Sequence, residues 1–185
     1  MTMYATPSDL AGYLQQDVDT FTATLALTKV SQLFDTRART HWGGTLSTTY
    51  SKPGYGQIEL VMPLGPLVAV SAVRVAGVTL TAGVDYTVIE QSVYRRSGFG
   101  IPWRFPPDLV EVDYTYGYPG TVPDDVAAVI LESAAAAYSN PQAVSREQID
   151  DYAVSYGSGA ATSGGLGLTQ AARDLADFYA GPVAA

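Results

Sequence analysis

Cysteine is absent from the 185 residues of this chain, which excludes disulfides, thiolate metal sites and a cysteine nucleophile. Histidine occurs once, at His41, so a metal site built on a pair of histidines is excluded as well. Positive charge is scarce, because 10 lysines and arginines stand against 18 acidic residues and leave a net charge of −8. A protein that binds phosphates needs the opposite balance, since its affinity comes from cationic side chains that release counterions. The composition therefore disfavours nucleic-acid binding.

Long hydrophobic runs are also lacking. The longest ones, around residues 60–73 and 126–137, are broken by proline, glycine or charge and are too short to cross a bilayer. The first ten residues contain no basic residue and lack the apolar segment of a signal peptide. Hydrophobic residues make up 47% of the chain and charged residues 15%, which lies well outside the range of disordered proteins. We therefore expect a folded, soluble protein.

Reactive motifs are missing too. Neither a G-x-S-x-G nucleophile motif nor a G-x-x-x-x-G-K-[ST] phosphate loop occurs. The single His41 is expected at a helix end, near the last carbonyls. The acidic pairs Asp124-Asp125 and Asp150-Asp151 lack the alternating oxygen ligands of a calcium loop. We predict no catalytic, cofactor-binding or metal-binding residues and no enzymatic activity.

The clearest helix signal lies in residues 121–141. Pro123 suits the first helical position, two acidic residues follow it where the helix dipole favours negative charge, and Asn140 and Pro141 end the pattern. One face is apolar at three- and four-residue spacing, through Val126, Val129, Ile130, Ala134, Ala137 and Tyr138. The opposite face is small or apolar as well, through Ala127, Ala128, Leu131, Ala135 and Ala136. We expect a helix over residues 123–139 that is contacted nearly all round, within the chain or within an assembly.

Two helices are predicted before it. Thr6 has the place of an N-cap for a helix over residues 7–14. A longer helix over residues 19–39 has one side formed by Ala23, Ala26, Leu27, Val30, Leu33, Phe34 and Arg37, with Phe21 and Leu25 beside it. Two amphipathic helices of this length need each other's apolar faces, so this helix is expected to pack on the one over residues 123–139.

Between these helices the period changes to that of strands. Residues 41–56, rich in glycine, serine and threonine, are interpreted as a loop. Alternating apolar residues then predict an antiparallel β insertion over residues 57–117, in which residues 97–108 form a long loop held by aromatic side chains. The predicted fold class is α+β: a small helical bundle with an inserted antiparallel β-sheet or hairpin region and an extended C-terminal tail that ends in a short helix.

The predicted domain organisation is a core over residues 1–141 and a tail over residues 142–185. The tail has one strand signal near residues 149–156, followed by a flexible linker composition over residues 157–167. Thr169 then caps a last short helix, which ends at Gly181-Pro182. A helix of this kind has little core of its own, so we expect it to dock, either on this domain or on a neighbour.

The most site-like feature is the aromatic segment of residues 99–105, with three arginines nearby. Aromatic residues interleaved with arginine stack on bases or sugars, or anchor protein interfaces, and the alternative is a loop pinned over the sheet. The candidate interface residues come from this segment, from the helix over residues 123–139 and from the last helix: Phe99, Trp103, Phe105, Ala128, Leu131, Ala135, Leu175, Phe178 and Tyr179.

Five pieces of sequence occur in an order typical of one family. They are LVMPLGPLV at residues 60–68, VRVAGVTL at 73–80, GVDY at 83–86, VEVDYTYGY at 110–118, and the Val122-Pro123 start of an alanine-rich helix that ends in YSNP at 138–141. In this order they resemble the head-to-tail connector (adaptor, or head completion) proteins of tailed bacteriophages, over about residues 6–156.

The resemblance implies a structural virion protein of the neck, made in the host cytoplasm, with no catalysis and no membrane partner. Copies are expected to form a dodecameric ring between the portal protein and a head-closure (stopper) or tail-terminator protein. DNA is expected to pass through the central channel without specific binding, which suits a net charge of −8. Two alternatives stay open: a stopper or tail-terminator ring protein of the same neck, and a non-catalytic carbohydrate- or protein-binding β module that uses residues 99–105.

Overall fold

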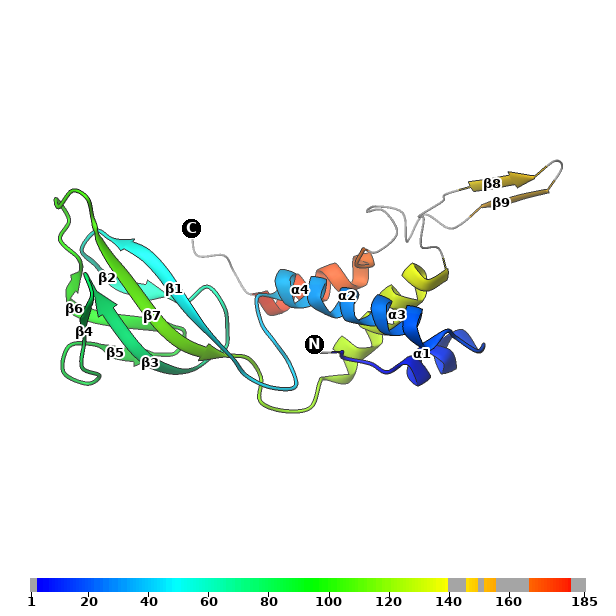
Figure 1. The fold of residues 1–185 in the computed structure, drawn as a ribbon, viewed down its shortest axis with the longest axis horizontal. Helices are drawn as coiled ribbons and strands as arrows, with labels where there is room; N and C mark the ends of the chain where they lie inside the picture. Colours follow the sequence, from blue (N-terminus) through cyan, green and yellow to red (C-terminus); the bar gives the residue numbers. More distant parts are fainter. Residues whose placement is uncertain (1–2, 140–145, 150–151, 156–166, 181–185) are drawn as a thin grey trace. The chain divides into compact units, whose positions relative to one another are not determined.

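A computed structural model of the chain describes residues 3–139, 146–149, 152–155 and 167–180. It contains helices and antiparallel sheets, so the predicted α+β class is confirmed (Figure 1). The chain divides into two compact units, a helical unit formed by residues 1–38 and 121–185, and a β unit formed by residues 39–120. The helical unit is therefore assembled from both ends of the sequence, and the β unit is the segment inserted between them.

The helical unit contains α1 (Pro7–Leu14), α2 (Thr20–Ala38), α3 (Asp124–Ser139), α4 (Gln170–Ala180) and the antiparallel hairpin β8 (Arg146–Ile149) and β9 (Tyr152–Ser155). The helices predicted over residues 7–14, 19–39 and 123–139 are confirmed within one residue at each end. The tail differs from the expected single strand, because it forms a hairpin. Several predicted features lie outside the described residues. They are the helix termini at Asn140-Pro141 and at Gly181-Pro182, most of the linker over residues 157–167, and the Asp150-Asp151 pair.

Capping side chains set the helix starts in the first part of the chain. The Thr6 hydroxyl accepts a hydrogen bond from the Asp9 amide, and the Asp9 carboxylate accepts one from the Thr6 amide, which completes a capping box at α1. Asp19 caps α2 differently: its carboxylate accepts from the amide and the hydroxyl of Thr22, and its carbonyl accepts from the Ala23 amide. Hydrogen bonds from the hydroxyl and the amide of Thr6 lower the pKa of Asp9, and those from the hydroxyl and the amide of Thr22 lower the pKa of Asp19. At α3 the Pro123 carbonyl accepts the first helical bond from the Ala127 amide, so Pro123 is the N-cap and stands one position earlier than predicted.

The last helix docks within its own chain. Helix α4 packs on α2 and α3, and its start is fixed by Thr169, whose carbonyl accepts from the Arg173 amide. The Ser133 hydroxyl of α3 lies 3.1 Å from the Thr169 amide, and both side chains are buried. Arg37 of α2 donates to Asp177 of α4 at 2.6 Å, which lowers the pKa of Asp177, although both side chains are about half exposed. The packing at Thr169 therefore holds α4 more firmly than the exposed ion pair does.

Replacing Thr169 by alanine is expected to destabilise the helical unit by about 1–2 kcal/mol, because α4 loses its cap and Ser133 loses a buried partner. Urea unfolding followed by far-UV circular dichroism measures this change. Thr36→Ala is the matched control, since that exposed hydroxyl only bonds the Gln32 carbonyl of its own helix. An effect of Thr169→Ala no larger than that of Thr36→Ala would show that the cap does not hold α4.

The β unit consists of two sheets. A four-stranded sheet has the order β1-β7-β3-β4 and a three-stranded sheet has the order β2-β6-β5, with every pairing antiparallel. The strands are β1 (Leu46–Gly54), β2 (Gln57–Val61), β3 (Leu67–Val75), β4 (Val78–Thr79), β5 (Thr87–Ile89), β6 (Ser92–Phe99) and β7 (Asp108–Tyr116).

The loop predicted over residues 41–56 is wrong, because nine of these residues, Leu46–Gly54, form strand β1. Strand β1 is an edge strand paired with β7 along its whole length, so main-chain hydrogen bonds hold a sequence that has little apolar character. Pro53 is tolerated there because an edge strand needs only half of its N–H groups for the sheet.

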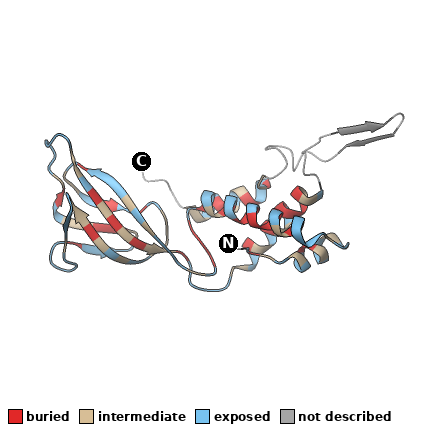
Figure 2. Ribbon diagram, viewed as in Figure 1, coloured by how far each residue is buried: buried red, intermediate tan, exposed pale blue. Residues whose placement is uncertain are grey.

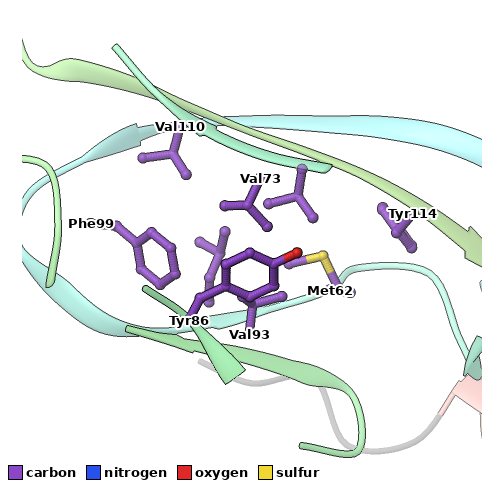
Figure 3. Packing of buried hydrophobic residues seen from close by; sticks show 9 residues of the cluster. Met62, Val73, Tyr86, Val93, Phe99, Val110 and Tyr114 are labelled. Carbon is purple, nitrogen blue, oxygen red and sulfur yellow. The ribbon is translucent and has the colours of Figure 1, made fainter. Parts of the chain in front are cut away.

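The core of the β unit lies between the two sheets. Figure 3 shows side chains of both sheets converging there, among them Val73 and Val110 from one sheet and Val93 and Phe99 from the other. The whole cluster comprises Leu60, Met62, Val73, Tyr86, Val93, Phe99, Val110, Val112 and Tyr114. Burial raises the pKa of Tyr114 to about 12. The β unit therefore has a hydrophobic core of its own.

Backbone segments meet closely where β1 turns into β2. The Gly56 amide donates to the Phe99 carbonyl at 2.8 Å, which ties this turn to the end of β6. Gly100 has a φ of +79°, and a Cβ atom added to it would lie 2.5 Å from the Gly54 carbonyl oxygen. Only glycine meets both conditions without a shift of the backbone.

Candidate interaction surfaces

The aromatic segment of residues 99–105 divides into a buried and an exposed part. Phe99 ends β6 and is 0% exposed in the core of the β unit, so it is not available as an interface residue. Trp103 and Phe105 lie in the loop between β6 and β7 and are 85% and 94% exposed. The prediction that aromatic side chains pin this loop is therefore wrong for Trp103 and Phe105. Arg104, which lies between them in the sequence, donates to Asp108 at 2.8 Å across the loop.

The predicted interface residues of helix α3 also differ in exposure. Ala128 is exposed and Leu131 is half-buried, but Ala135 is 5% exposed and packs inside the helical unit. The fully buried side of the helix carries Val126, Ile130, Ser133 and Ala134. On the exposed side Asp124, Ala128 and Glu132 follow one another at four-residue spacing, so they form one outward row.

Helix α4 presents one large exposed aromatic side chain. Phe178 is 77% exposed, whereas Leu175 and Tyr179 are half-buried. The Tyr179 hydroxyl donates to the Asp125 carboxylate of α3 at 3.2 Å, and its ring meets that of Phe178 edge-on at 5.6 Å. The sequence-based set therefore contributes three well-exposed aromatic residues, namely Trp103 and Phe105 in the β unit and Phe178 in the helical unit.

Sequence reasoning missed an exposed apolar row on α2. Phe21 is 78% exposed, and Leu25 and Leu33 are exposed as well, so the predicted placement of Leu33 on the buried side is wrong. Phe21, Leu25, Lys29 and Leu33 are spaced by four residues and form one outward row, which we call the α2 row. Buried and exposed residues alternate along this helix in Figure 2. The sequence alone does not single out this row, because on a helical wheel Leu33 lies about 20° from Ala26, which is buried.

Carboxylates on the outer face of the four-stranded sheet are held by neighbouring strands. Arg74 of β3 lies 2.8 Å from Asp113 and 3.6 Å from Glu111, both on β7, and the Thr49 hydroxyl of β1 donates to Asp113 at 2.7 Å. The bonds from Thr49 and Arg74 lower the pKa of Asp113. Glu59 of β2 accepts in the same way from Tyr94 and Ser92 of β6. These groups join adjacent strands, which accounts for their positions without a ligand.

The single histidine lies at the start of the β unit. His41 is buried, and its backbone carbonyl accepts from the Tyr118 amide at 2.7 Å, while the neighbouring Trp42 stacks on the Tyr118 ring at 5.9 Å. Across the described residues, no group of three or more His, Asp or Glu side chains is placed to hold a metal ion. None of the described helices combines the length and the apolar character that a membrane span requires.

The comparisons with known proteins found matches to this chain among solved structures. No protein-family model and no curated protein sequence matches the chain. A chain in a structure of the virion of a native gene transfer agent particle superposes with a TM-score of 0.55 and 16% sequence identity, and the match covers 82% of both chains. A chain in the neck of an empty gene transfer agent particle, computed with C6 symmetry, superposes with a TM-score of 0.53 and 14% identity over 85% of both chains. The chain thus has the fold of protein chains found in the virion and in the neck of gene transfer agent particles.

Proposed function

We propose that this chain is a structural neck protein of a tailed-phage-like particle and that its copies form a ring between the head and the tail. The observation that carries the proposal is the fold match over 85% of both chains to a component of a particle neck. Because that neck was computed with sixfold symmetry, a ring of six or of twelve copies is compatible with it, and the family resemblance implies twelve.

Exposed apolar side chains support an assembled protein over an isolated monomer. Both units carry large, strongly exposed apolar residues, among them Phe21 and Phe178 in the helical unit and Trp103 and Phe105 in the β unit. Side chains of this kind anchor protein interfaces, where aromatic residues are over-represented. A ring needs two different contact faces on each copy, and the chain has exposed apolar residues on several elements.

Within the neck, we propose the adaptor position next to the portal protein, with a head-closure or tail-terminator protein on the other side. The resemblance of five ordered sequence pieces to connector proteins favours this position over that of a stopper or a tail terminator. DNA would pass through the ring without specific binding, since a net charge of −8 opposes retention of a polyanion. The role is structural and needs no reactive group in this chain.

The proposal is tested by electron microscopy of the purified protein with and without the portal protein of the same particle. We expect ring-shaped density attached to one end of the portal, with a rotational symmetry that includes a sixfold axis. A matched reference is the portal alone, imaged under the same conditions. Portal particles that look identical with and without this protein, at micromolar concentrations of both, would contradict the adaptor position.

A further inference from the structure

The helical unit has two outward rows of side chains whose chemistry is complementary. The α2 row is apolar at Phe21, Leu25 and Leu33 and carries one cation, Lys29. The outward row of α3 carries a small residue, Ala128, between the carboxylates Asp124 and Glu132, and we call it the α3 row.

The two rows cannot meet within one copy. Helices α2 and α3 pack on each other in the core of the helical unit, where Val30 and Phe34 of α2 and Ile130 and Ala134 of α3 are fully buried. Each row lies on the side of its helix away from these residues, because the rows are exposed where the packing sides are buried. The two rows therefore face outward in different directions, which is the arrangement that a head-to-tail contact between identical copies requires.

Charge and size both favour this pairing. Neither Lys29 nor Glu132 makes an ion pair with a side chain that the structure describes, so within that part of the chain both are available to pair across an interface. The small side chain of Ala128 lets a facing helix approach closely, and the large side chains of the α2 row fill the space on either side of it. We infer that the α2 row of one copy docks on the α3 row of the next copy, with Lys29 facing the carboxylates of that row.

This inference rests on the proposed ring and names its subunit contact. The contact is heterologous, so each copy uses its α2 row for one neighbour and its α3 row for the other, and repetition closes the ring. This contact is expected to weaken only modestly as salt rises, because screening affects Lys29 and the carboxylates that it faces but not the apolar part of the contact. The β unit is left free for contacts with other neck proteins.

The test is charge reversal, read out as the fraction of portal particles that carry a ring. Lys29→Glu and Glu132→Lys are each expected to reduce ring occupancy about tenfold at limiting protein concentration, since each places like charges opposite one another. The double variant, Lys29→Glu with Glu132→Lys, is expected to recover most of the occupancy. Circular dichroism verifies that every variant keeps the native helix content.

A second pair of variants tests the apolar part. Leu25→Asp is expected to abolish ring formation, whereas Val84→Asp, at an exposed apolar position of the β unit, is expected to leave it unchanged. If Lys29→Glu and Leu25→Asp both form rings on portal as often as the wild-type protein does, the inference is overturned and the proposed function is unaffected. A double variant as defective as the single ones would also overturn it. Absence of rings from the wild-type protein with portal would instead contradict the proposed function, and the inference with it.

Discussion

Replacing Gly100 by alanine is expected to destabilise the β unit by more than about 3 kcal/mol, the range of severe single substitutions. The new Cβ atom would lie 2.5 Å from the Gly54 carbonyl oxygen and 2.8 Å from the Gly54 carbonyl carbon, so the backbone of β1 would have to move. The positive φ of +79° adds strain, because the left-handed region disfavours residues with a Cβ atom. The turn that joins the two sheets would then lose its fit to the end of β6.

Gly77 provides a matched control for this substitution. Its φ is also +79°, but a Cβ atom added there would meet nothing within 4 Å. Gly77→Ala therefore carries only the conformational strain, about 1–2 kcal/mol. Guanidinium unfolding followed by the fluorescence of Trp42, in a Trp103→Phe background, measures both changes in the β unit. Equal effects of Gly100→Ala and Gly77→Ala would mean that the close approach of Gly54 does not matter.

Replacing Phe34 by alanine is expected to destabilise the helical unit by about 3–5 kcal/mol. The side chain is 0% exposed on α2, and its removal leaves a cavity in the core shared by the helices. Far-UV circular dichroism at 222 nm reports this loss, because the long helices all belong to the helical unit. The fluorescence transition of Trp42 is expected to shift less, since that residue belongs to the β unit.

Phe21→Ala is the control, because the same residue type on the same helix is 78% exposed. We expect its effect on unfolding to stay within about 0.5 kcal/mol. A comparable loss of stability at the two positions would show that the buried and exposed sides of α2 are assigned incorrectly. The two phenylalanines therefore test the helix orientation on which the docking of neighbouring copies depends.

Helices were predictable from the sequence because several independent signals coincide at their ends. Local signals mark the start of each of these helices. Helix α1 has a capping box at Thr6, α4 has an N-cap at Thr169, and α3 has two acidic residues after Pro123. Such signals depend on neighbouring residues alone. They do not reveal which side of a helix is covered when both sides are apolar, and this is why the exposure of Leu33 was not predicted.

Strand β1 was not predictable for the opposite reason. Its stability comes from pairing with β7, about 60 residues later in the chain, and its own side chains alternate only weakly. The aromatic segment posed a related problem, since Phe99, Trp103 and Phe105 look alike in sequence. Pairing of β6 with β2 and β5 places Phe99 in the core, and the loop that follows β6 exposes the other two.

Native mass spectrometry of the protein bound to its portal tests most directly whether the chain acts by assembling into a ring. Each copy adds 19.5 kDa, so the mass of the complex counts the copies. The account predicts one dominant complex whose number of copies is a multiple of six, with no partially filled series at saturation. A spectrum that contains only free portal and monomers at micromolar concentrations, or a random ladder of bound copies, would contradict it.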